Sequence, residues 1–444
     1  MKKIAIVGAG LVGSLQAILM AKKGYQVDVF ERRPDLRKAD EIGGRSINLA
    51  LSDRGWRALE LAGISDEIKK MSLPMFGRKM HDVEGNLSDL PYGLNGEAIY
   101  SVSRGGLNQK LMNLADDFPN ITYRFNRKCL DLDLKANTIS FKNTEEDKKE
   151  EYTYDQIFGT DGAFSAVRSR LQKTPMFNYS QEYLSHGYKE LVIPPNEDGT
   201  HRIANDALHI WPRGEFMMIA LPNMDGSFTC TLFFPMKGEL SFDTIKSEKD
   251  VMDFFEKTFP DAIPHMPTLV EDYFENPTST LVTVRCSPWN YEDKVLILGD
   301  ASHAIVPFYG QGMNSGFEDC TVFHNMYNEM EGNWDKLFEA FSTTRKPDAD
   351  AIADLALYNY IEMRDLSGDP DFLLRKKIEK KFAKMHPDKW MPLYSEVTFS
   401  HIPYHKALQG GEEKNKVMEE IMQMENIHEN WDKQEVMDKM LELV

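Results

Sequence analysis

Cysteine is scarce in this sequence. The 444 residues include only four cysteines, Cys129, Cys230, Cys286 and Cys320. None of them belongs to a C-x-x-C pair, so the spacing typical of a zinc site or a redox dithiol is missing. His401 and His405 have the i, i+4 spacing of two metal ligands on a helix, but Pro403 between them argues against a regular helix there. We therefore expect reduced thiols in a cytoplasmic protein and no metal site.

Long hydrophobic runs are also missing. The sequence contains no stretch of about 18 uninterrupted apolar residues, which is the length that a helix needs to span a membrane. Residues 1–7 look like the start of a signal peptide, but Gly8, Gly10 and Gly13 interrupt the apolar stretch and no A-x-A cleavage pattern follows. We therefore expect no membrane segment, and we expect the N-terminal residues to be part of the fold.

Basic residues are outnumbered by acidic ones. Lysine and arginine total 52 against 70 aspartates and glutamates, which gives a formal net charge of -18. This excess of negative charge opposes binding to nucleic acids and to anionic membrane surfaces. The hydrophobic fraction of 42% and the charged fraction of 27% are ordinary for a folded globular protein. At this length we expect two or three structural units rather than one small domain.

The N-terminal residues have the pattern of a βαβ unit. Residues 4–7 form a short apolar run, a helical segment rich in Ala and Leu reaches about Lys23, and residues 27–30 form a second short strand. The first strand leads into the helix through Gly-Ala-Gly-Leu-Val-Gly at 8–13. Glycines in such a turn let backbone N–H groups face a pyrophosphate, and Glu31 after the second strand can accept hydrogen bonds from a ribose. The pattern predicts a dinucleotide site on a parallel sheet.

Two later segments indicate which dinucleotide binds. Residues 159–168 read Gly-Thr-Asp-Gly-Ala-Phe-Ser-Ala-Val-Arg, and residues 299–316 read Gly-Asp-Ala-Ser-His-Ala-Ile-Val-Pro-Phe-Tyr-Gly-Gln-Gly-Met-Asn-Ser-Gly. Together they resemble the signature of the para-hydroxybenzoate hydroxylase group of flavin monooxygenases. The resemblance implies that the dinucleotide is FAD. It also implies that Asp300 contacts the ribityl chain and that the loop at 310–312 passes close to the isoalloxazine.

The same loop favours a flavin on physical grounds. Gly310, Gly312 and Gly316 at the start of a helix offer free N–H groups and a positive dipole end, which would stabilise negative charge on a reduced flavin. Arginines beside FAD in the family imply roles for Arg32 and Arg104, whereas a surface position is the competing interpretation for Arg33. The residues expected to bind FAD are Gly8, Gly10, Val12, Gly13, Glu31, Arg32, Ala50, Arg104, Asp300, Gly312, Met313 and Asn314.

Five longer strings are more specific: Gly-Arg-Ser-Ile-Asn-Leu-Ala-Leu-Ser at 44–52, Leu-His-Ile-Trp-Pro-Arg at 208–213, Phe-Met-Met-Ile-Ala-Leu-Pro-Asn-Met at 216–224, Tyr-Asn-Tyr-Ile-Glu-Met-Arg at 358–364 and Pro-Leu-Tyr-Ser-Glu-Val-Thr-Phe-Ser at 392–400. With these strings the chain resembles the kynurenine 3-monooxygenase family over about residues 1–408. The resemblance implies L-kynurenine as substrate, with its carboxylate clamped by the planar guanidinium of Arg78. The other substrate residues implied are Tyr92, Asn359 and Tyr394 at the same end of the substrate, and Pro307 and Phe308 beside its ring. The role of Tyr309 stays open because the family varies at that position.

The reaction implied by the resemblance is hydroxylation of L-kynurenine to 3-hydroxykynurenine through a flavin hydroperoxide, with consumption of NADPH and O2. No catalytic side chain is assigned, because the ring amine already activates the ring carbon. No second GxGxxG unit is evident, so we expect NADPH to bind transiently. Animal members of the family continue into a hydrophobic anchor, whereas residues 416–444 here are acidic and amphipathic. We therefore expect a cytoplasmic monomer or homodimer without a membrane or nucleic-acid partner.

Two alternatives stay open. A flavin amine oxidase also begins with GxGxxG and an acid, and Gly43-Gly44-Arg45 is similar to its second glycine motif, but the Asp161-Gly162 and Gly299-Asp300 segments are foreign to it. A non-catalytic flavoprotein that binds kynurenine-like ligands would bind its ligand without consuming NADPH. The need for NADPH therefore separates the hydroxylase from both alternatives.

The chain beyond the first βαβ unit predicts an interleaved fold. Residues 207–235 contain three β-rich runs that favour an antiparallel meander, residues 295–298 return to a parallel strand, and the pattern is helical from about 346. We expect an α/β fold in which a Rossmann-type FAD-binding domain is interleaved with an antiparallel-sheet substrate domain, followed by C-terminal helices that cap the substrate pocket. The expected boundaries are 1–75, 100–178 and 286–345 for the first, 76–99 and 179–285 for the second, and 346–444 for the helices.

Overall fold

The computed structural model describes residues 2–38, 48–93, 96–363 and 369–444, so the Gly43-Gly44-Arg45 motif lies outside the described residues. The chain divides into two compact units, each built from three stretches of sequence. Unit 1 comprises Met1–Leu73, Tyr100–Leu184 and Thr280–Ala353, and unit 2 comprises Pro74–Ile99, Ser185–Ser279 and Asp354–Val444.

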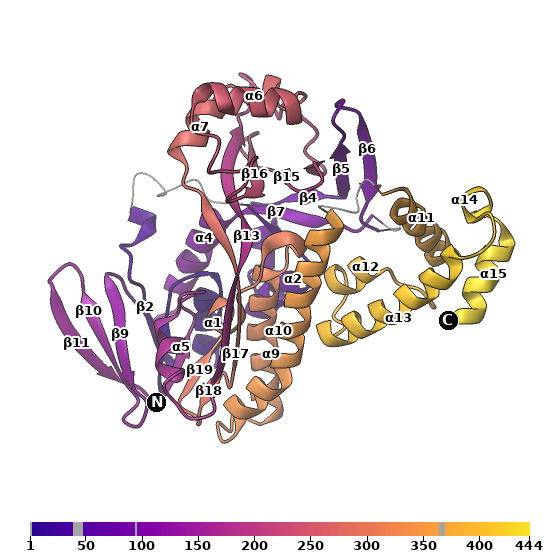
Figure 1. The fold of residues 1–444 in the computed structure, drawn as a ribbon. Helices are drawn as coiled ribbons and strands as arrows, with labels where there is room; N and C mark the ends of the chain where they lie inside the picture. Colours follow the sequence, from indigo (N-terminus) through magenta and orange to yellow (C-terminus); the bar gives the residue numbers. More distant parts are fainter. Residues whose placement is uncertain (1, 39–47, 94–95, 364–368) are drawn as a thin grey trace. The chain divides into compact units, whose positions relative to one another are not determined.

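Unit 1 is built on a six-stranded sheet in the order β18-β19-β12-β1-β2-β8 (Figure 1). β1 pairs in parallel with β12 and β2, with Ile6 opposite Phe158 and Val29, while β18 is an antiparallel edge strand. β12 is buried along its whole length, as expected for a parallel strand covered on both faces. The expected βαβ unit is confirmed. The bounds are β1 Lys3–Val7, α1 Leu11–Lys22, β2 Gln26–Phe30, β8 Ile121–Arg124, β12 Gln156–Gly159, β18 Asn290–Tyr291 and β19 Val295–Ile297.

Helices and two small sheets complete unit 1. Helix α9 packs against both α1 and α2, and β9, β10 and β11 form an antiparallel sheet attached through the stacked rings of Phe30 and Phe141, whose centroids are 4.0 Å apart (Figure 1). The bounds are η1 Leu36–Lys38, β3 Asn48–Leu51, α2 Asp53–Ala62, α3 Ser65–Lys69, α4 Arg104–Asp116, β9 Arg127–Asp133, β10 Thr138–Asn143, β11 Lys148–Thr153, α5 Ala166–Leu171, α8 Asp300–His303, η3 Pro307–Tyr309 and α9 Gly312–Glu329. Five elements continue from one unit into the other: β4 Leu73–Met75, β7 Ile99–Ser103, β13 Asn178–Ile193, β17 Ser279–Ser287 and α10 Leu337–Ile361.

Unit 2 contains the expected antiparallel meander. Strands β14, β15 and β16 pair in succession, and β5 adds in parallel to β14, which places Arg78 opposite Leu208. The seven-stranded sheet has the order β17-β13-β16-β15-β14-β5-β6. Apolar side chains of this sheet pack against α6 and α7 in one core, which includes Trp211, Phe234 and Phe255. The bounds are β5 Gly77–His81, β6 Leu87–Pro91, β14 Leu208–Pro212, β15 Met217–Pro222, β16 Phe228–Pro235, α6 Glu248–Thr258, η2 Ile263–His265 and α7 Leu269–Glu275.

The C-terminal part of unit 2 is helical, as the sequence predicted. Its helices share a core of their own, in which Phe382, Trp390, Met418 and Met437 are buried. Among the residues that the structure describes, no helix has the length and apolar character needed to cross a bilayer. The bounds are α11 Pro370–Met385, α12 Leu393–Thr398, α13 Tyr404–Met422, α14 Ile427–Asn430 and α15 Gln434–Leu443.

A chain of buried polar side chains joins β5 to β14. The His81 Nδ1 atom lies 2.6 Å from Asp261 Oδ2, and its Nε2 atom lies 2.8 Å from His209 Nδ1. The His209 Nε2 atom in turn donates to the Ala204 carbonyl at 2.7 Å. These bonds fix the end of the strand that carries Arg78.

Candidate active site

The glycine-rich turn between β1 and α1 leaves open space at one glycine only. Gly8 has a φ of +106°, and a Cβ there would lie 2.5 Å from the Thr160 carbonyl oxygen. A Cβ on Gly13 would lie 2.0 Å from the Gly8 oxygen, whereas a Cβ on Gly10 would meet nothing within 4 Å. Gly8 and Gly13 are therefore required by the protein itself. Gly10, the residue that caps α1, borders free space where a phosphate can approach the helix N-terminus.

Glu31 lies next to this turn at the end of β2. Its carboxylate accepts hydrogen bonds from the Ala9 N–H at 3.1 Å and from the backbone and Nε of Arg33 at 3.0 and 2.9 Å. Glu31 is buried, while Arg32 is exposed. Arg33 is also exposed, which agrees with the surface position that the sequence left as the competing interpretation. Its backbone N–H and Nε nevertheless hold Glu31, the acid that is expected to bind ribose. A carboxylate has further lone pairs with which to accept a hydroxyl.

Asp300 begins α8 directly after β19, at the carboxyl end of the parallel sheet. Its side chain is exposed to solvent, yet desolvation by surrounding protein raises the pKa of its carboxyl, and the nearby cation Arg104 offsets part of that shift. Arg104 is the first residue of α4, whose N-terminus is capped by Ser103. The structure therefore brings together two residues, Asp300 and Arg104, that the sequence assigned to FAD.

The loop before α9 is held against β3 by one amide side chain. Asn314 donates from Nδ2 to the carbonyls of Ala50 and Gly310, both at 2.8 Å, and its Oδ1 accepts the N–H of Ser52 at 2.9 Å. These hydrogen bonds occupy the Asn314 side chain. A cofactor would therefore contact the backbone of Asn314 rather than its side chain. The first backbone bond within the helix runs from Ser315 to Gln311, so the N–H groups before Ser315 point out of the helix start.

The other predicted residues of unit 1 flank this loop. Val12 lies in the first turn of α1, and a Cβ on Gly316 of α9 would come within 2.7 Å of its Cγ2. Met313 is buried in α9, while Gly312 is half-buried. In η3, Pro307 is exposed and Phe308 is buried. Contact of any of these residues with FAD or with a substrate ring stays a prediction.

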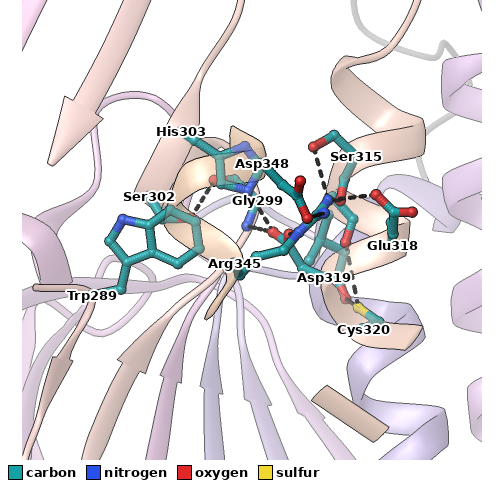
Figure 2. A network of polar contacts seen from close by, with 12 residues as sticks. Trp289, Gly299, Ser302, His303, Ser315, Glu318, Asp319, Cys320, Arg345 and Asp348 are labelled. Atoms are coloured by element: carbon teal, nitrogen blue, oxygen red, sulfur yellow. Dashed lines mark hydrogen bonds and ion pairs between the residues drawn. The ribbon is translucent and has the colours of Figure 1, made fainter. Parts of the chain in front are cut away.

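Beneath the loop lies a buried ionic network that the sequence did not reveal (Figure 2). The Asp319 carboxylate of α9 contacts His303 Nε2 at 2.6 Å and Arg345 Nε at 2.8 Å, and it accepts the Gly299 N–H at 2.8 Å. Arg345 also pairs with Glu318 at 2.8 Å. The adjacent acids Glu318 and Asp319 among the apolar residues of α9 were the only signal in the sequence.

In unit 2, three of the four predicted head-group residues lie together. The rings of Tyr92 and Tyr394 stack with centroids 5.2 Å apart and an interplanar angle of 10°. The Arg78 guanidinium carbon lies 4.7 Å from the Tyr394 ring centroid and 5.7 Å from that of Tyr92. Asn359 is buried on α10, and its Nδ2 lies 3.3 Å from Met363 Sδ. Its place beside the other three stays a prediction.

Two polar atoms of this cluster lack a protein partner. Among the described residues, Arg78 Nε and the Tyr92 hydroxyl are buried without a hydrogen bond. Burial raises the pKa of the Tyr92 hydroxyl well above its usual value, and Arg78 offsets only part of that shift. Tyr92 is therefore a neutral hydroxyl with a proton to donate. Two buried, unsatisfied donors are costly unless an acceptor such as a carboxylate binds them.

Glu362, which the sequence did not single out, helps to keep Arg78 positively charged. Burial opposes the charged form of Arg78, but Tyr394, Tyr92 and Glu362 together raise the pKa of its guanidinium above the usual value. Arg78 therefore stays a cation. Within the described residues no group of three or more His, Cys, Asp or Glu could hold a metal ion, and all four cysteines are free thiols.

The contrast between the glycines yields a test of the FAD cradle. We expect Gly13→Ala to disrupt the fold of unit 1, because overpacking costs roughly 1–3 kcal/mol or more and the clash is with backbone. Gly10→Ala should keep the fold but weaken FAD binding about tenfold or more, since its methyl group occupies the open space. Thermal unfolding of the apoprotein and fluorescence titration with FAD measure the two effects. Wild-type FAD affinity in Gly10→Ala would remove this turn from the cofactor site.

The fold of the chain is shared with known oxygenases. A tetrameric form of 2-methyl-3-hydroxypyridine-5-carboxylic acid oxygenase superposes with a TM-score of 0.67 at 18% identity, over 88% of this chain and 98% of that chain. The p-nitrophenol 4-monooxygenase of Pseudomonas putida superposes with a TM-score of 0.65 at 17% identity, over 95% of this chain and 97% of that chain. At these identities the likeness shows the fold alone, and it confirms the expected mixed α/β class.

Sequence comparisons go further. A family model described as an FAD binding domain matches residues 1–356. The kynurenine 3-monooxygenase of Flavobacterium johnsoniae is 52% identical over 442 residues, covering 100% of this chain and 98% of that protein. The kynurenine 3-monooxygenase of Sus scrofa is 43% identical, covering 94% of this chain and 88% of that protein. With a cradle for a dinucleotide in unit 1 and unsatisfied donors around an arginine in unit 2, the chain belongs to the kynurenine 3-monooxygenase family of FAD-binding proteins.

Proposed function

We propose that this protein hydroxylates L-kynurenine to 3-hydroxykynurenine, using FAD, NADPH and O2. The observation that carries the proposal is the cluster of Arg78, Tyr92 and Tyr394, in which the Nε atom of Arg78 and the neutral hydroxyl of Tyr92 are buried without a hydrogen bond. An amino-acid carboxylate supplies two oxygens in the plane of a guanidinium fork. Membership of the family indicates the substrate, L-kynurenine, which carries this carboxylate on an aromatic amine.

We propose that the FAD-binding residues are those expected from the sequence, with Arg33 added as the residue that orients Glu31. The residues present fit this cofactor, because Gly10 borders open space and the exposed, desolvated Asp300 lies at the carboxyl end of the parallel sheet. Glu31 would accept hydrogen bonds from the adenosine ribose. The N–H groups at the start of α9 would favour negative charge on the flavin.

The chemistry divides between the cofactor and the chain. When bound, FAD reduced by NADPH supplies the activated oxygen that no side chain provides, with one atom of O2 going to the ring and the other to water. Arg78 and Tyr92 would hold the carboxylate of the substrate, which fixes the position of the ring relative to the rest of the molecule. The ring amine activates the neighbouring carbon, so no side chain has to ionise the substrate. Pro307, Phe308 and Asn359 would complete the substrate site.

We propose that unit 1 binds FAD and unit 2 binds the head group of the substrate, with the helices from residue 346 onward belonging to the substrate-binding part. Tyr394 supports this last point, because it comes from those helices and stacks on Tyr92. We further propose that the protein is cytoplasmic, which the four free thiols support, and that it is a monomer or homodimer. Size-exclusion chromatography with light scattering would show which of the two forms is present.

The reaction is tested by product analysis with labelled oxygen gas. We expect the FAD-loaded protein to convert L-kynurenine, in the presence of NADPH and ¹⁸O2, to a product with one heavy oxygen on the ring, as measured by mass spectrometry. Consumption of kynurenine without NADPH, with release of ammonia, would identify an amine oxidase instead. Ligand binding without any consumption of NADPH would identify a non-catalytic flavoprotein.

The clamp is tested at Arg78. We expect Arg78→Ala to weaken kynurenine binding roughly tenfold to a hundredfold, because a hydrogen bond to a charged group contributes about 1.5–3 kcal/mol. FAD content should stay unchanged, since Arg78 belongs to unit 2. Lys79→Ala is the matched control, because the neighbouring residue of a strand faces the opposite side and Lys79 pairs with the exposed Asp89. Equal kynurenine affinity in the two variants would contradict the clamp.

The unsatisfied hydroxyl gives a second test, at Tyr92. We expect Tyr92→Phe to leave the free energy of unfolding unchanged or raised in the absence of substrate, because it removes a buried hydroxyl that lacks a partner. The same change should weaken kynurenine binding about twofold to tenfold, as loss of one neutral hydrogen bond does. Denaturant unfolding and kynurenine titration measure the two effects. A loss of stability together with unchanged kynurenine affinity would assign the hydroxyl to the fold.

A further inference from the structure

The Asp319 carboxylate collects donors from two separate segments, residues 299–303 around α8 and helix α10. Its Oδ2 atom accepts the Gly299 N–H at 2.8 Å and lies 2.6 Å from His303 Nε2, and its Oδ1 atom accepts from Arg345 Nε at 2.8 Å (Figure 2). Asp319 is fully buried. A buried carboxylate is stable only when its charge and its lone pairs are both satisfied, as they are here. These two segments are therefore tied to one point on α9.

The hydrogen bond to Gly299 holds the chain where it leaves the parallel sheet. The last sheet bond of this strand runs from the Leu298 N–H to the Gly159 carbonyl at 2.9 Å. Gly299 then takes a φ of +59°, and a Cβ there would lie 3.0 Å from Val12 Cγ2. The Gly299 N–H points away from any further strand partner and into the Asp319 carboxylate. This bond therefore sets the turn that presents Asp300.

Arg345 links the same carboxylate to the start of α9. Its Nη2 atom donates to the Ser315 carbonyl at 3.2 Å and pairs with Glu318 at 2.8 Å. Burial raises the pKa of the Asp319 carboxyl, but His303 and Arg345 more than offset this and hold it below the usual value. The carboxylate therefore remains ionised at neutral pH, and the geometry of the turn does not change with proton uptake there.

We infer that Asp319 is a positioning residue for the cofactor. It fixes the Gly299–Asp300 turn against the start of α9, so that the Asp300 carboxyl and the free N–H groups of α9 are presented together. Asp319 acts through Gly299 and is itself buried, so it makes no contact with the reacting atoms. The inference rests on FAD binding by unit 1, which the Gly10→Ala variant tests at a different place.

Two isosteric substitutions in the same network test the inference. Asp319→Asn replaces one of the two acceptor oxygens by an NH2 group, so that the three donors compete for one oxygen. Asp348→Asn is the matched control, because Asp348 also contacts Arg345, at 3.3 Å, but not Gly299. The measurements on purified protein are the Kd for FAD from fluorescence titration of the apoprotein, hydrogen–deuterium exchange of the peptide that contains Gly299, and thermal unfolding.

We expect Asp319→Asn to raise the Kd for FAD about tenfold or more and to speed exchange at Gly299, as loss of a charged acceptor does. Asp348→Asn should leave the Kd within about twofold of wild type, because the turn keeps its acceptor. An unchanged Kd in Asp319→Asn would overturn the inference. Equal weakening by both variants would also overturn it, because it would show a general effect of the buried charges.

A second pair of variants decides the matter if Asp319→Asn fails to fold. His303→Leu removes a donor to Asp319, whereas His303→Gln replaces it with an amide N–H that can reach the same oxygen. We expect FAD binding to be weakened in His303→Leu and restored to within about threefold of wild type in His303→Gln, because only the latter keeps Asp319 oriented. Equal FAD affinity in these two variants would overturn the inference.

Discussion

The arrangement in unit 1 of Gly299, α8, α9 and the part of α10 that carries Arg345 depends on the buried carboxylate of Asp319. Leaving one charge of a buried ion pair without its partner costs about 3–5 kcal/mol, which is a large part of the stability of a typical domain. Because Asp319 is satisfied only when Gly299, His303 and Arg345 are all in place, the end of the parallel sheet and helices α8, α9 and α10 have to form together. The turn that presents Asp300 is thus fixed by the packing of these elements.

Close packing of two glycines against Val12 also fixes the position of these segments. Added Cβ atoms on Gly299 and Gly316 would lie 3.0 and 2.7 Å from Val12 Cγ2. The glycine-rich turn of α1 and the glycine-rich start of α9, which the sequence presents as two separate cofactor motifs, therefore also pack against each other through one valine. A glycine in this part of the chain can be required by a neighbouring side chain as much as by a ligand, and only Gly10 borders open space in the first turn.

Much of the fold was predictable because its signals are local. The βαβ unit, the meander from 207 to 235 and the helical C-terminal part follow from residue periodicity and turn residues, and the structure confirms them. Resemblance placed Arg78, Tyr92 and Tyr394 in one site, and the structure brings them together from β5, from the residue after β6 and from α12. Three features were not predictable, because each depends on which distant segment faces a side chain: the pairing of Arg33 with Glu31, the bridge made by Asn314, and the burial of Asp319.

In unit 2 the hydrogen bonds from His81 to His209 and from His209 to Ala204 run in the same direction. A carbonyl can only accept, so the proton of His209 lies on Nε2, toward Ala204, and its bare Nδ1 accepts from His81 Nε2. Burial is the main cause that lowers the pKa of His209 to about 4, and the nearby His81 and Lys79 contribute to the lowering. Between pH 6.5, the ordinary value for an exposed imidazole, and about pH 4, the unfolded chain takes up a proton that the folded chain refuses. Lowering the pH over this interval therefore lowers the stability of the sheet that carries Arg78. The carboxylate of Asp319 in the other unit stays charged over the same interval.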